Sequence, residues 1–314
     1  MPRAWLMLEA LVQQWRELGE RVYPASLAPE AVRVLDGLDR RIELLIASGD
    51  PAVAELEDDI RSRLPADFDL TITIAPGLEY YPLKNAAVAV ATGDVLVFID
   101  SDVIPDPGWM AHLLGSFGRP DIDVVCAQTY VRPVDTYSRA FAAGWTYAPR
   151  HNEGRIFQPK KFYANTIAFR QEVFHKVGGF PALGCKTRGA ASLLGQALGE
   201  IGVGVWENEN AAVDHPPPSS YRHLAVRAIA HGRDQYMKHD EHRHIGGLVN
   251  SVGLAAGRLG RGCYRTLRYA GEIGLQPWAI PAALAITSTY YGFFALGGVL
   301  THLSPEMMGR RFRV

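Results

Sequence analysis

The chain has 314 residues, of which 48% are hydrophobic and 21% charged, so collagen, coiled coil and wholesale disorder are excluded as fold classes. Its three cysteines, Cys126, Cys185 and Cys263, lie too far apart for a zinc motif or a disulfide framework, which indicates a reducing compartment. The net charge of −1 conceals an uneven distribution, because residues 216–314 carry 12 basic and 5 acidic side chains while the rest of the chain is acidic.

The first third of the sequence alternates between helical and strand patterns. Apolar residues at helical spacing predict a helix over 4–20, and a continuous apolar run predicts a buried strand over 41–48. A helix, a strand, a second helix and an apolar strand are predicted next, over 52–64, 69–75, 82–93 and 94–102. This alternation predicts an α/β fold with a mostly parallel sheet, in which ligands bind at the carboxyl ends of the strands.

The alternation continues up to a run of three prolines, Pro216 to Pro218, which is typical of a domain boundary. Before the prolines we predict strands over 122–131 and 203–215, a strand with a short helix over 162–180, and a helix over 192–202. We therefore expect three parts: a first domain over 1–215, a basic helical region over 216–272 and an apolar segment over 273–305.

The apolar segment contains no Asp, Glu, Lys or Arg between Ile273 and Pro305. As a helix, its inner part from Ala279 to Leu303 would extend about 37 Å, enough to cross the hydrocarbon core of a bilayer. Basic residues flank it on both sides, which favours membrane contact over a buried helical hairpin and leaves spanning, re-entrant and interfacial placements open. These residues are Arg258, Arg261, Arg265, Arg268, Arg310, Arg311 and Arg313.

Two carboxylates, Asp100 and Asp102, follow the predicted buried strand directly. If the strand stays extended there, both side chains point to one face, and their mutual repulsion favours a bound cation. Hard divalent cations take oxygen ligands and accept phosphate oxygens in their remaining positions. The pattern therefore indicates a site for a metal with a diphosphate, although a simple turn explains most isolated Asp-x-Asp sequences.

The surrounding motifs make the pattern more specific. Between Tyr80 and Met110 the sequence contains Lys84-Asn85, Gly93-Asp94, Asp100-Ser101-Asp102 and Pro107-Gly108-Trp109 in that order. A second segment, Phe162 to Phe180, follows. This ordered series resembles the inverting glycosyltransferase family 2, over roughly residues 5–215.

The resemblance implies a Rossmann-like domain of the GT-A type that binds a nucleotide-diphosphate sugar. It implies that Asp102 ligates Mg²⁺ or Mn²⁺, with His215 close to the metal, and it places the donor near Asp50, Lys84, Asp100 and Ser101. On the acceptor side it places Trp145, Asn165 and Arg188. For Asp50 a helix N-cap is an equal alternative, and for His215 a structural histidine is favoured over a ligand.

The chain departs from the family pattern in three places. The family begins with an apolar strand, whereas only Met1 to Ala4 precede the first predicted helix, so we expect that strand to be absent; a truncated reading frame is one explanation. Lys84 replaces the usual Arg and lacks its bidentate fork. Ala190-Ala191 stand where the family has an acidic pair that supplies the general base, with Glu153 and Asp106 as weak substitutes.

We therefore expect a metal-dependent glycosyltransferase that acts on a lipid-linked or cell-envelope glycan at the cytoplasmic face of the cell membrane, with doubtful activity. The alternative is a non-catalytic relative that binds nucleotide sugars or serves as a scaffold. A sugar-nucleotide nucleotidyltransferase is disfavoured, because that class has a Gly-rich phosphate loop after its first strand. Nucleic acid is also disfavoured, because the basic residues of the tail are interleaved with apolar ones.

Overall fold

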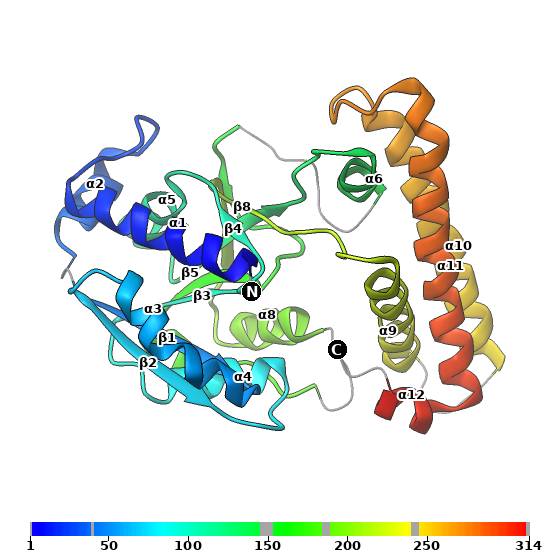
Figure 1. Ribbon diagram of the computed structural model, residues 1–314, viewed down its shortest axis with the longest axis horizontal. Coiled ribbons are helices and arrows are strands. Elements are labelled where there is room, and N and C mark those ends of the chain that lie inside the picture. The colour runs from blue at the N-terminus through cyan, green and yellow to red at the C-terminus, as the bar shows by residue number, and fades with distance from the viewer. Residues whose placement is uncertain (1, 39–40, 145–152, 184–188, 240–244, 312–314) are drawn as a thin grey trace. The chain divides into compact units, whose positions relative to one another are not determined.

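The computed structural model describes residues 2–38, 41–144, 153–183, 189–239 and 245–311, and Figure 1 shows their helices and strands. The chain divides into two compact units, which are treated separately here. Unit 1 comprises Met1–Thr129, His151–Ala182 and Ala190–Asp214, and unit 2 comprises Tyr130–Arg150, Leu183–Gly189 and His215–Val314. The predicted division into 1–215, 216–272 and 273–305 stays a prediction.

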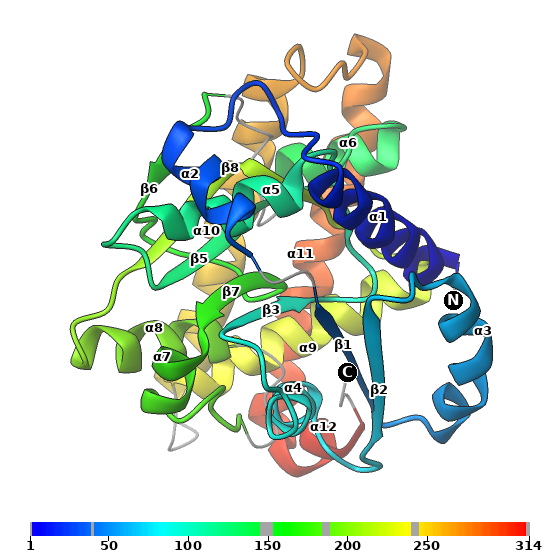
Figure 2. The same cartoon turned by 90° about the vertical axis from the view of Figure 1, so that its left-hand side faces the viewer.

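Unit 1 begins with two helices and a parallel pair of strands. Helices α1 (Pro2–Gly19) and α2 (Pro29–Asp36) come first. Strands β1 (Ile42–Ser48) and β2 (Phe68–Ile74) then lie side by side, in a register that pairs Ile42 with Phe68 (Figure 2). The crossover between them contains the 3-10 helix η1 (Pro51–Leu56) and helix α3 (Glu57–Arg63), which together replace the single helix predicted over 52–64.

A second, larger sheet has the order β3–β7–β5–β8–β4, and a short strand, β6, pairs with β8. Unlike β1 and β2, β7 is antiparallel to both β3 and β5, and β8 is antiparallel to β4 and β6. The α/β fold class is confirmed. Among the strand pairs whose register is described, only β1 and β2 are parallel, because β7 enters the larger sheet antiparallel between β3 and β5. The strands are β3 (Val95–Ile99), β4 (Ile104–Pro105), β5 (Val124–Tyr130), β6 (Ile156–Phe157), β7 (Thr166–Arg170) and β8 (Val205–Asp214).

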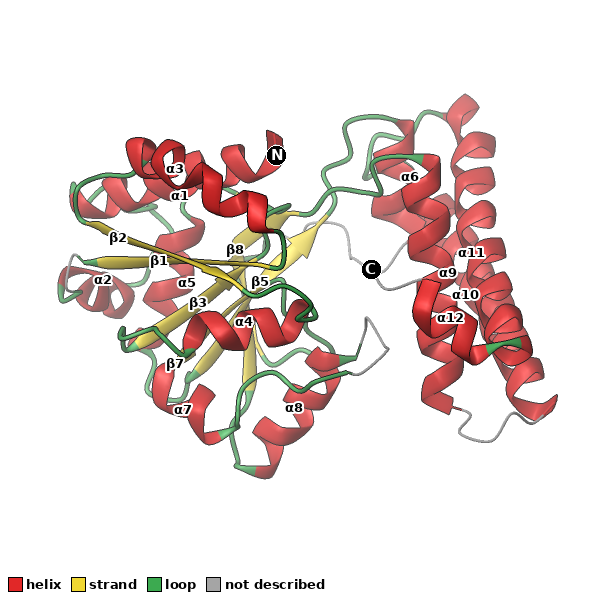
Figure 3. Cartoon of the chain, turned by 60° about the horizontal axis from the view of Figure 1, so that its bottom comes forward, coloured by secondary structure: helices red, strands yellow, loops and turns green. Residues whose placement is uncertain are grey.

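Helices cover both faces of the larger sheet, so its strands are buried on two sides (Figure 3). On one face, Trp109 and Leu113 of α5 (Trp109–Gly115) pack with α1, and the 3-10 helix η2 (Ser116–Gly118) follows α5. On the other face, Phe174 and Leu194 anchor α7 (Gln171–Lys176) and α8 (Ala190–Glu200), beside α4 (Tyr80–Val88). Burial on both faces explains why β5 reads as a nearly continuous apolar run.

Unit 2 is helical. It contains α6 (Thr136–Gly144), α9 (Tyr221–His239), α10 (Ile245–Tyr269), the 3-10 helix η3 (Pro277–Ala279), α11 (Ile280–Leu303) and α12 (Pro305–Arg311). Helix α11 packs against both α9 and α10 (Figure 1). At the α9 crossing, a Cβ on Gly232 would overlap the Phe294 carbonyl, and a Cβ on Gly297 would overlap the Ile229 carbonyl. The two backbones therefore touch directly.

A buried arginine of α9 also connects α9 to α12. Arg233 is fully buried, pairs with Asp234 at 2.7 Å and donates to the Met308 carbonyl at 3.3 Å. Among the described residues, Pro277–Leu303 is the one helical stretch long and apolar enough to cross a membrane, and a third of its most apolar window is buried inside the unit. A single stretch of this kind also occurs as the core helix of a soluble bundle, so it does not by itself establish a membrane span.

Candidate functional site

The carboxyl end of β3 positions Asp100 against Lys84. The strand ends at Ile99, and the N–H of Val103 donates to the carbonyl of Asp100, so residues 100–103 form a turn. The Lys84 ammonium lies 2.8 Å from an Asp100 carboxylate oxygen, and both side chains are largely buried. The condition of an extended strand does not hold at Asp100, because the chain turns there: Asp100 lies against Lys84, and Asp102 is exposed.

Lys84 is held by more than its ion pair. Its ammonium also donates to the Ala164 carbonyl at 3.0 Å and lies 4.7 Å and 5.6 Å from the ring centroids of Tyr80 and Phe180. Burial raises the pKa of the Asp100 carboxyl above its ordinary value, and the Lys84 charge opposes that rise. The counter-charge of Asp100 therefore comes from Lys84, whereas the sequence had suggested that a bound cation supplies it.

A second cation, Arg3 at the start of α1, joins the ends of β3 and β8. Its Nε donates to the Asp102 carbonyl at 2.8 Å, and its Nη2 lies 3.1 Å from an Asp214 carboxylate oxygen. Strand β4 brings Asp214 to this point by pairing it with Ile104. Arg3 and Asp214 were not predicted as site residues; the Asp next to the end of the predicted strand 203–215 was the available signal.

An exposed Asp102 fits a metal ion that completes its coordination with water and phosphate oxygens, because Mg²⁺ commonly binds proteins through one or two carboxylates. Among the residues that the structure describes, no three His, Cys, Asp or Glu side chains are grouped closely enough to hold a metal ion alone. His215 is buried, and its Nδ1 lies 2.8 Å from the Pro216 carbonyl oxygen. The roles of Asp102 and His215 as metal ligands stay predictions.

Asp50 caps η1. Its Oδ1 accepts a hydrogen bond from the Ala52 N–H at 3.0 Å, so the N-cap alternative is found in the structure. The side chain is exposed at the carboxyl end of β1. Ser101, at the tip of the turn after β3, is exposed as well. The contacts of Asp50 and Ser101 with a nucleotide sugar stay predictions.

Asn165 presents a buried amide beside Asp100. The backbone carbonyl of Asn165 accepts a hydrogen bond from the Asp100 N–H at 2.9 Å, and the side-chain Oδ1 accepts one from the Thr129 hydroxyl at 3.0 Å. Its Nδ2 is buried and has no hydrogen-bond partner within the described protein. An unsatisfied buried donor costs about 1–3 kcal/mol, so Asn165 is suited to an oxygen atom of a bound molecule. The other predicted acceptor-side residues, Trp145 and Arg188, lie outside the described residues.

The alanine pair lies in the first turn of α8, two residues earlier than the predicted helix start. Ala190 is fully buried and Ala191 is half-buried, so Ala191 is the position from which a side chain reaches solvent. Of the two substitute carboxylates, Asp106 is buried, whereas Glu153 is exposed and forms a surface ion pair with Arg155 at 3.1 Å. A role for either as the general base stays a prediction.

Comparison with known proteins gives the class of the molecule. Residues 80–180 match the family model for glycosyl transferase family 2, and these residues contain both segments on which the resemblance rests. The chain is a glycosyltransferase, and its resemblance to family 2 is confirmed. A search of curated proteins finds no match.

Solved structures support the fold of this glycosyltransferase. The chain is similar to the mannosyltransferase PcManGT from Pyrobaculum calidifontis in complex with GDP-Man and Mn²⁺, at 16% identity and a TM-score of 0.51, over 96% of this chain and 97% of that one. At this identity the similarity shows the fold, which is of the GT-A type. GalNAc-T7 with UDP, GalNAc and Mn²⁺ is more distant, at 11% identity and a TM-score of 0.42, over 65% of this chain and 45% of that one. This similarity is too weak to establish a shared fold.

The glycosyltransferase contains a second group of acids, on β8, that was not predicted from the sequence. Glu209 on β8 is buried and binds the Arg155 guanidinium at 2.7 Å and the Arg155 N–H at 3.0 Å. Burial and the nearby Glu209 charge raise the pKa of Glu207 to about 7, and Arg155 opposes the rise. Glu207 precedes Asp214 by seven residues of β8, or about 23 Å of extended strand, so it is too far from the β3 turn to act as a general base there.

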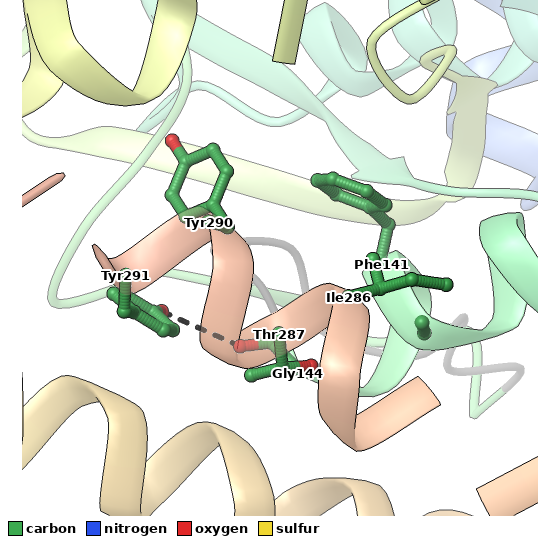
Figure 4. A pocket seen from close by; sticks show the side chains of 7 residues that line it. Phe141, Gly144, Ile286, Thr287, Tyr290 and Tyr291 are labelled. Carbon is green, nitrogen blue, oxygen red and sulfur yellow. Dashed lines mark hydrogen bonds between the residues drawn. The ribbon is translucent and has the colours of Figure 1, made fainter. Parts of the chain in front are cut away.

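Unit 2 of the glycosyltransferase contains a small apolar cavity between α6 and α11 (Figure 4). Phe141, Thr287 and Tyr290 are among the residues that line it, and the Tyr291 hydroxyl donates to the Gly144 carbonyl at 3.4 Å. Its volume of about 10 Å³ is at the lower limit for one water molecule. The cavity is therefore a packing defect and not a ligand site.

Proposed function

We propose that this glycosyltransferase uses Mg²⁺ or Mn²⁺ to transfer a sugar from a nucleotide-diphosphate sugar to a lipid-linked or cell-envelope glycan. The observation that carries the proposal is the turn after β3, where the exposed Asp102 carboxylate lies next to a neutralised Asp100. Two cations, Lys84 and Arg3, bind this turn from different elements. Each cation is already paired with a carboxylate, Lys84 with Asp100 and Arg3 with Asp214, so a metal bound at Asp102 would supply the positive charge that a diphosphate needs.

The residues of the turn divide the work of donor binding. Lys84 keeps Asp100 in its buried position, and Arg3 fixes the Asp102 backbone, so the Asp102 carboxylate is presented from a rigid turn. A metal bound there would offset the negative charge that develops on the leaving diphosphate. Asn165, proposed on the acceptor side, lies beside Asp100, and its buried Nδ2 has no hydrogen-bond partner among the described residues.

Transfer itself requires a base near the acceptor hydroxyl, and the first turn of α8 offers only alanine at Ala190 and Ala191. General-base assistance typically contributes 10²- to 10⁴-fold, so we infer slow transfer by this chain. The same observation supports the second candidate function, a relative that binds nucleotide sugars without transferring them. Donor hydrolysis measured beside transfer to a glycan distinguishes the two, because a pure binding protein performs neither.

The acceptor is proposed to lie at the cytoplasmic face of the cell membrane. Support comes from the charge-free α11 and from the basic excess of residues 216–314. Basic segments next to an apolar helix are attracted to anionic lipid headgroups.

The test is a thermal-shift titration of the full chain with GDP, GDP-mannose, UDP and UDP-sugars, with Mn²⁺ or with EDTA. GDP-mannose comes first because PcManGT contains GDP-Man. A ligand at 100 times its Kd stabilises a fold by about 2.7 kcal/mol. We expect stabilisation with Mn²⁺ that Asp102→Ala removes and Asp58→Ala, an exposed substitution on α3, preserves. Equal stabilisation in EDTA would contradict the metal site.

A further inference from the structure

Helix α10 carries an apolar face that unit 2 does not cover. Val249, Val252, Tyr264 and Leu267 are 65%, 44%, 66% and 57% exposed. At 3.6 residues per turn these four side chains lie on one side of the helix. The opposite side is buried and includes Ser251, Ala255 and Thr266. The exposed side therefore carries two apolar pairs, one toward each end of the helix, with the small exposed residues Gly253, Ala256, Gly257 and Gly260 between them.

A row of arginines flanks this face. Helix α10 contains Arg258, Arg261, Arg265 and Arg268, at positions i, i+3, i+7 and i+10, and no acidic residue. The arginines thus lie along one edge, between the buried side and the apolar side. Arg258, nearest the buried side, binds Gln235 at 2.9 Å and covers the Phe294 ring, whereas Arg261 and Arg268 are exposed. An exposed apolar face with a basic edge is the pattern of a helix that lies in a membrane interface.

The packing of α11 decides between crossing the bilayer and lying on it. Helix α11 contacts α9 at Gly297 and α10 at Gly298, whose Cβ would overlap the Ser251 side chain. If α11 crossed the bilayer with these contacts intact, the charged side chains of its neighbours would enter the hydrocarbon. An arginine at the bilayer centre is costly, and α10 alone has four in its second half.

We propose that α10 lies flat on an anionic lipid surface, with its apolar face in the acyl boundary and its arginines among the phosphates, and that α11 supports it without crossing the bilayer. This inference rests on the membrane placement proposed above. The positive charge of the helix and the negative charge of the headgroups are complementary. Helix α10 itself contains no acidic side chain, and Glu272, just beyond its end, lies 3.4 Å from Arg268 alone among the four arginines in the ion pairs described here. The apolar face supplies affinity that salt does not screen.

The experiment is co-sedimentation of the full chain with vesicles of phosphatidylcholine alone or with added phosphatidylglycerol. We expect strong binding to the anionic vesicles only. Tyr264→Ser/Leu267→Ser should weaken the partition constant at least about tenfold, because two large apolar groups leave the interface. The matched control, Leu6→Ser/Val22→Ser, removes apolar side chains of similar exposure from unit 1 and should bind unchanged.

Two further measurements complete the test. Arg261→Gln/Arg268→Gln should reduce the preference for anionic vesicles, and alkaline carbonate should release the bound protein. Retention after carbonate would show a spanning helix and overturn the in-plane placement. Equal binding to both vesicle types would overturn the role of charge. Binding that persists in Tyr264→Ser/Leu267→Ser but disappears in high salt would indicate a general polyanion surface and also overturn the proposal.

The outcome is separable from that of the proposed function. Stabilisation by GDP-mannose with Mn²⁺ reports on the β3 turn of unit 1, whereas vesicle binding reports on α10 of unit 2. A chain that binds the nucleotide and ignores vesicles would refute the surface proposed here alone. The thermal unfolding of each α10 variant should match that of the parent, because the substituted side chains are exposed.

Discussion

Replacing Lys84 by Met should destabilise the fold by leaving the buried Asp100 carboxylate without its counter-charge. At their 2.8 Å separation, two unit charges interact by about 6 kcal/mol at an effective dielectric constant of 20. Part of that attraction offsets the cost of desolvating the two groups. Removal of one partner from a buried pair typically costs about 3–5 kcal/mol, and the partial exposure of this pair favours the lower end, about 3 kcal/mol.

The loss should depend on pH in a defined direction. Burial raises the pKa of Asp100, and Lys84→Met removes the main influence that lowers it. A carboxyl group whose pKa is higher in the folded than in the unfolded state stabilises the fold at low pH, and this stability is lost as the pH rises through the folded pKa. The variant should therefore be closer to the parent at about pH 5 than at about pH 7.5.

Urea unfolding followed by circular dichroism measures both effects. Asp100→Asn in the Lys84→Met background should recover part of the loss, because the unpaired charge is then gone. The control is Arg61→Met, which breaks an exposed ion pair with Glu57 of nearly the same length, 2.9 Å, and should cost at most about 0.5 kcal/mol. Additive effects of Lys84→Met and Asp100→Asn would refute the ion pair as the source of stability.

Three more predictions concern other parts of the chain. Ala191→Asp should raise the rate of sugar transfer by about 10²- to 10⁴-fold at constant donor affinity. The exposed control Ser192→Asp should leave the rate unchanged, and a transfer rate typical of active glycosyltransferases in the unaltered chain would refute this base position. Glu207, whose pKa is about 7, should make the free energy of unfolding fall as the pH rises from about 4.5 to 7, and Glu207→Gln should remove that fall in urea titrations. Gly297→Ala should destabilise unit 2 by about 1–3 kcal/mol or more, whereas Gly292→Ala, where a Cβ meets no atom, should stabilise α11 by up to about 1 kcal/mol in thermal unfolding.

The elements of unit 1 were predictable wherever a local pattern determines them. The apolar runs at 41–48 and 94–102 contain β1 and β3, and the alternation at 69–75 contains β2 to within one residue. Strand direction was not predictable in the same way, because it depends on how the chain returns after a long connection. For that reason the antiparallel entry of β7 between β3 and β5 escaped the sequence argument.

The candidate site shows the same limit. Asp100, Asp102 and Lys84 were found because they lie within one short motif. Arg3 and Asp214 were missed because each is unremarkable in its own segment, and only the fold brings them together, at a separation of 211 residues. Asp100 was also assigned a donor contact without regard to Lys84, since sequence spacing carries no information about which cation a buried carboxylate meets.

The direct contact between the backbones of α9 and α11 has a mechanical consequence. Side chains between helices act as a compliant layer, but at Gly232 and Gly297 there is none. Pushing or tilting α11 should therefore displace α9 by nearly the same amount, and the Arg233 link to the Met308 carbonyl extends this stiff connection to α12. Helices α9, α11 and α12 would then move as one rigid body, so a displacement of any one of them is shared by the other two.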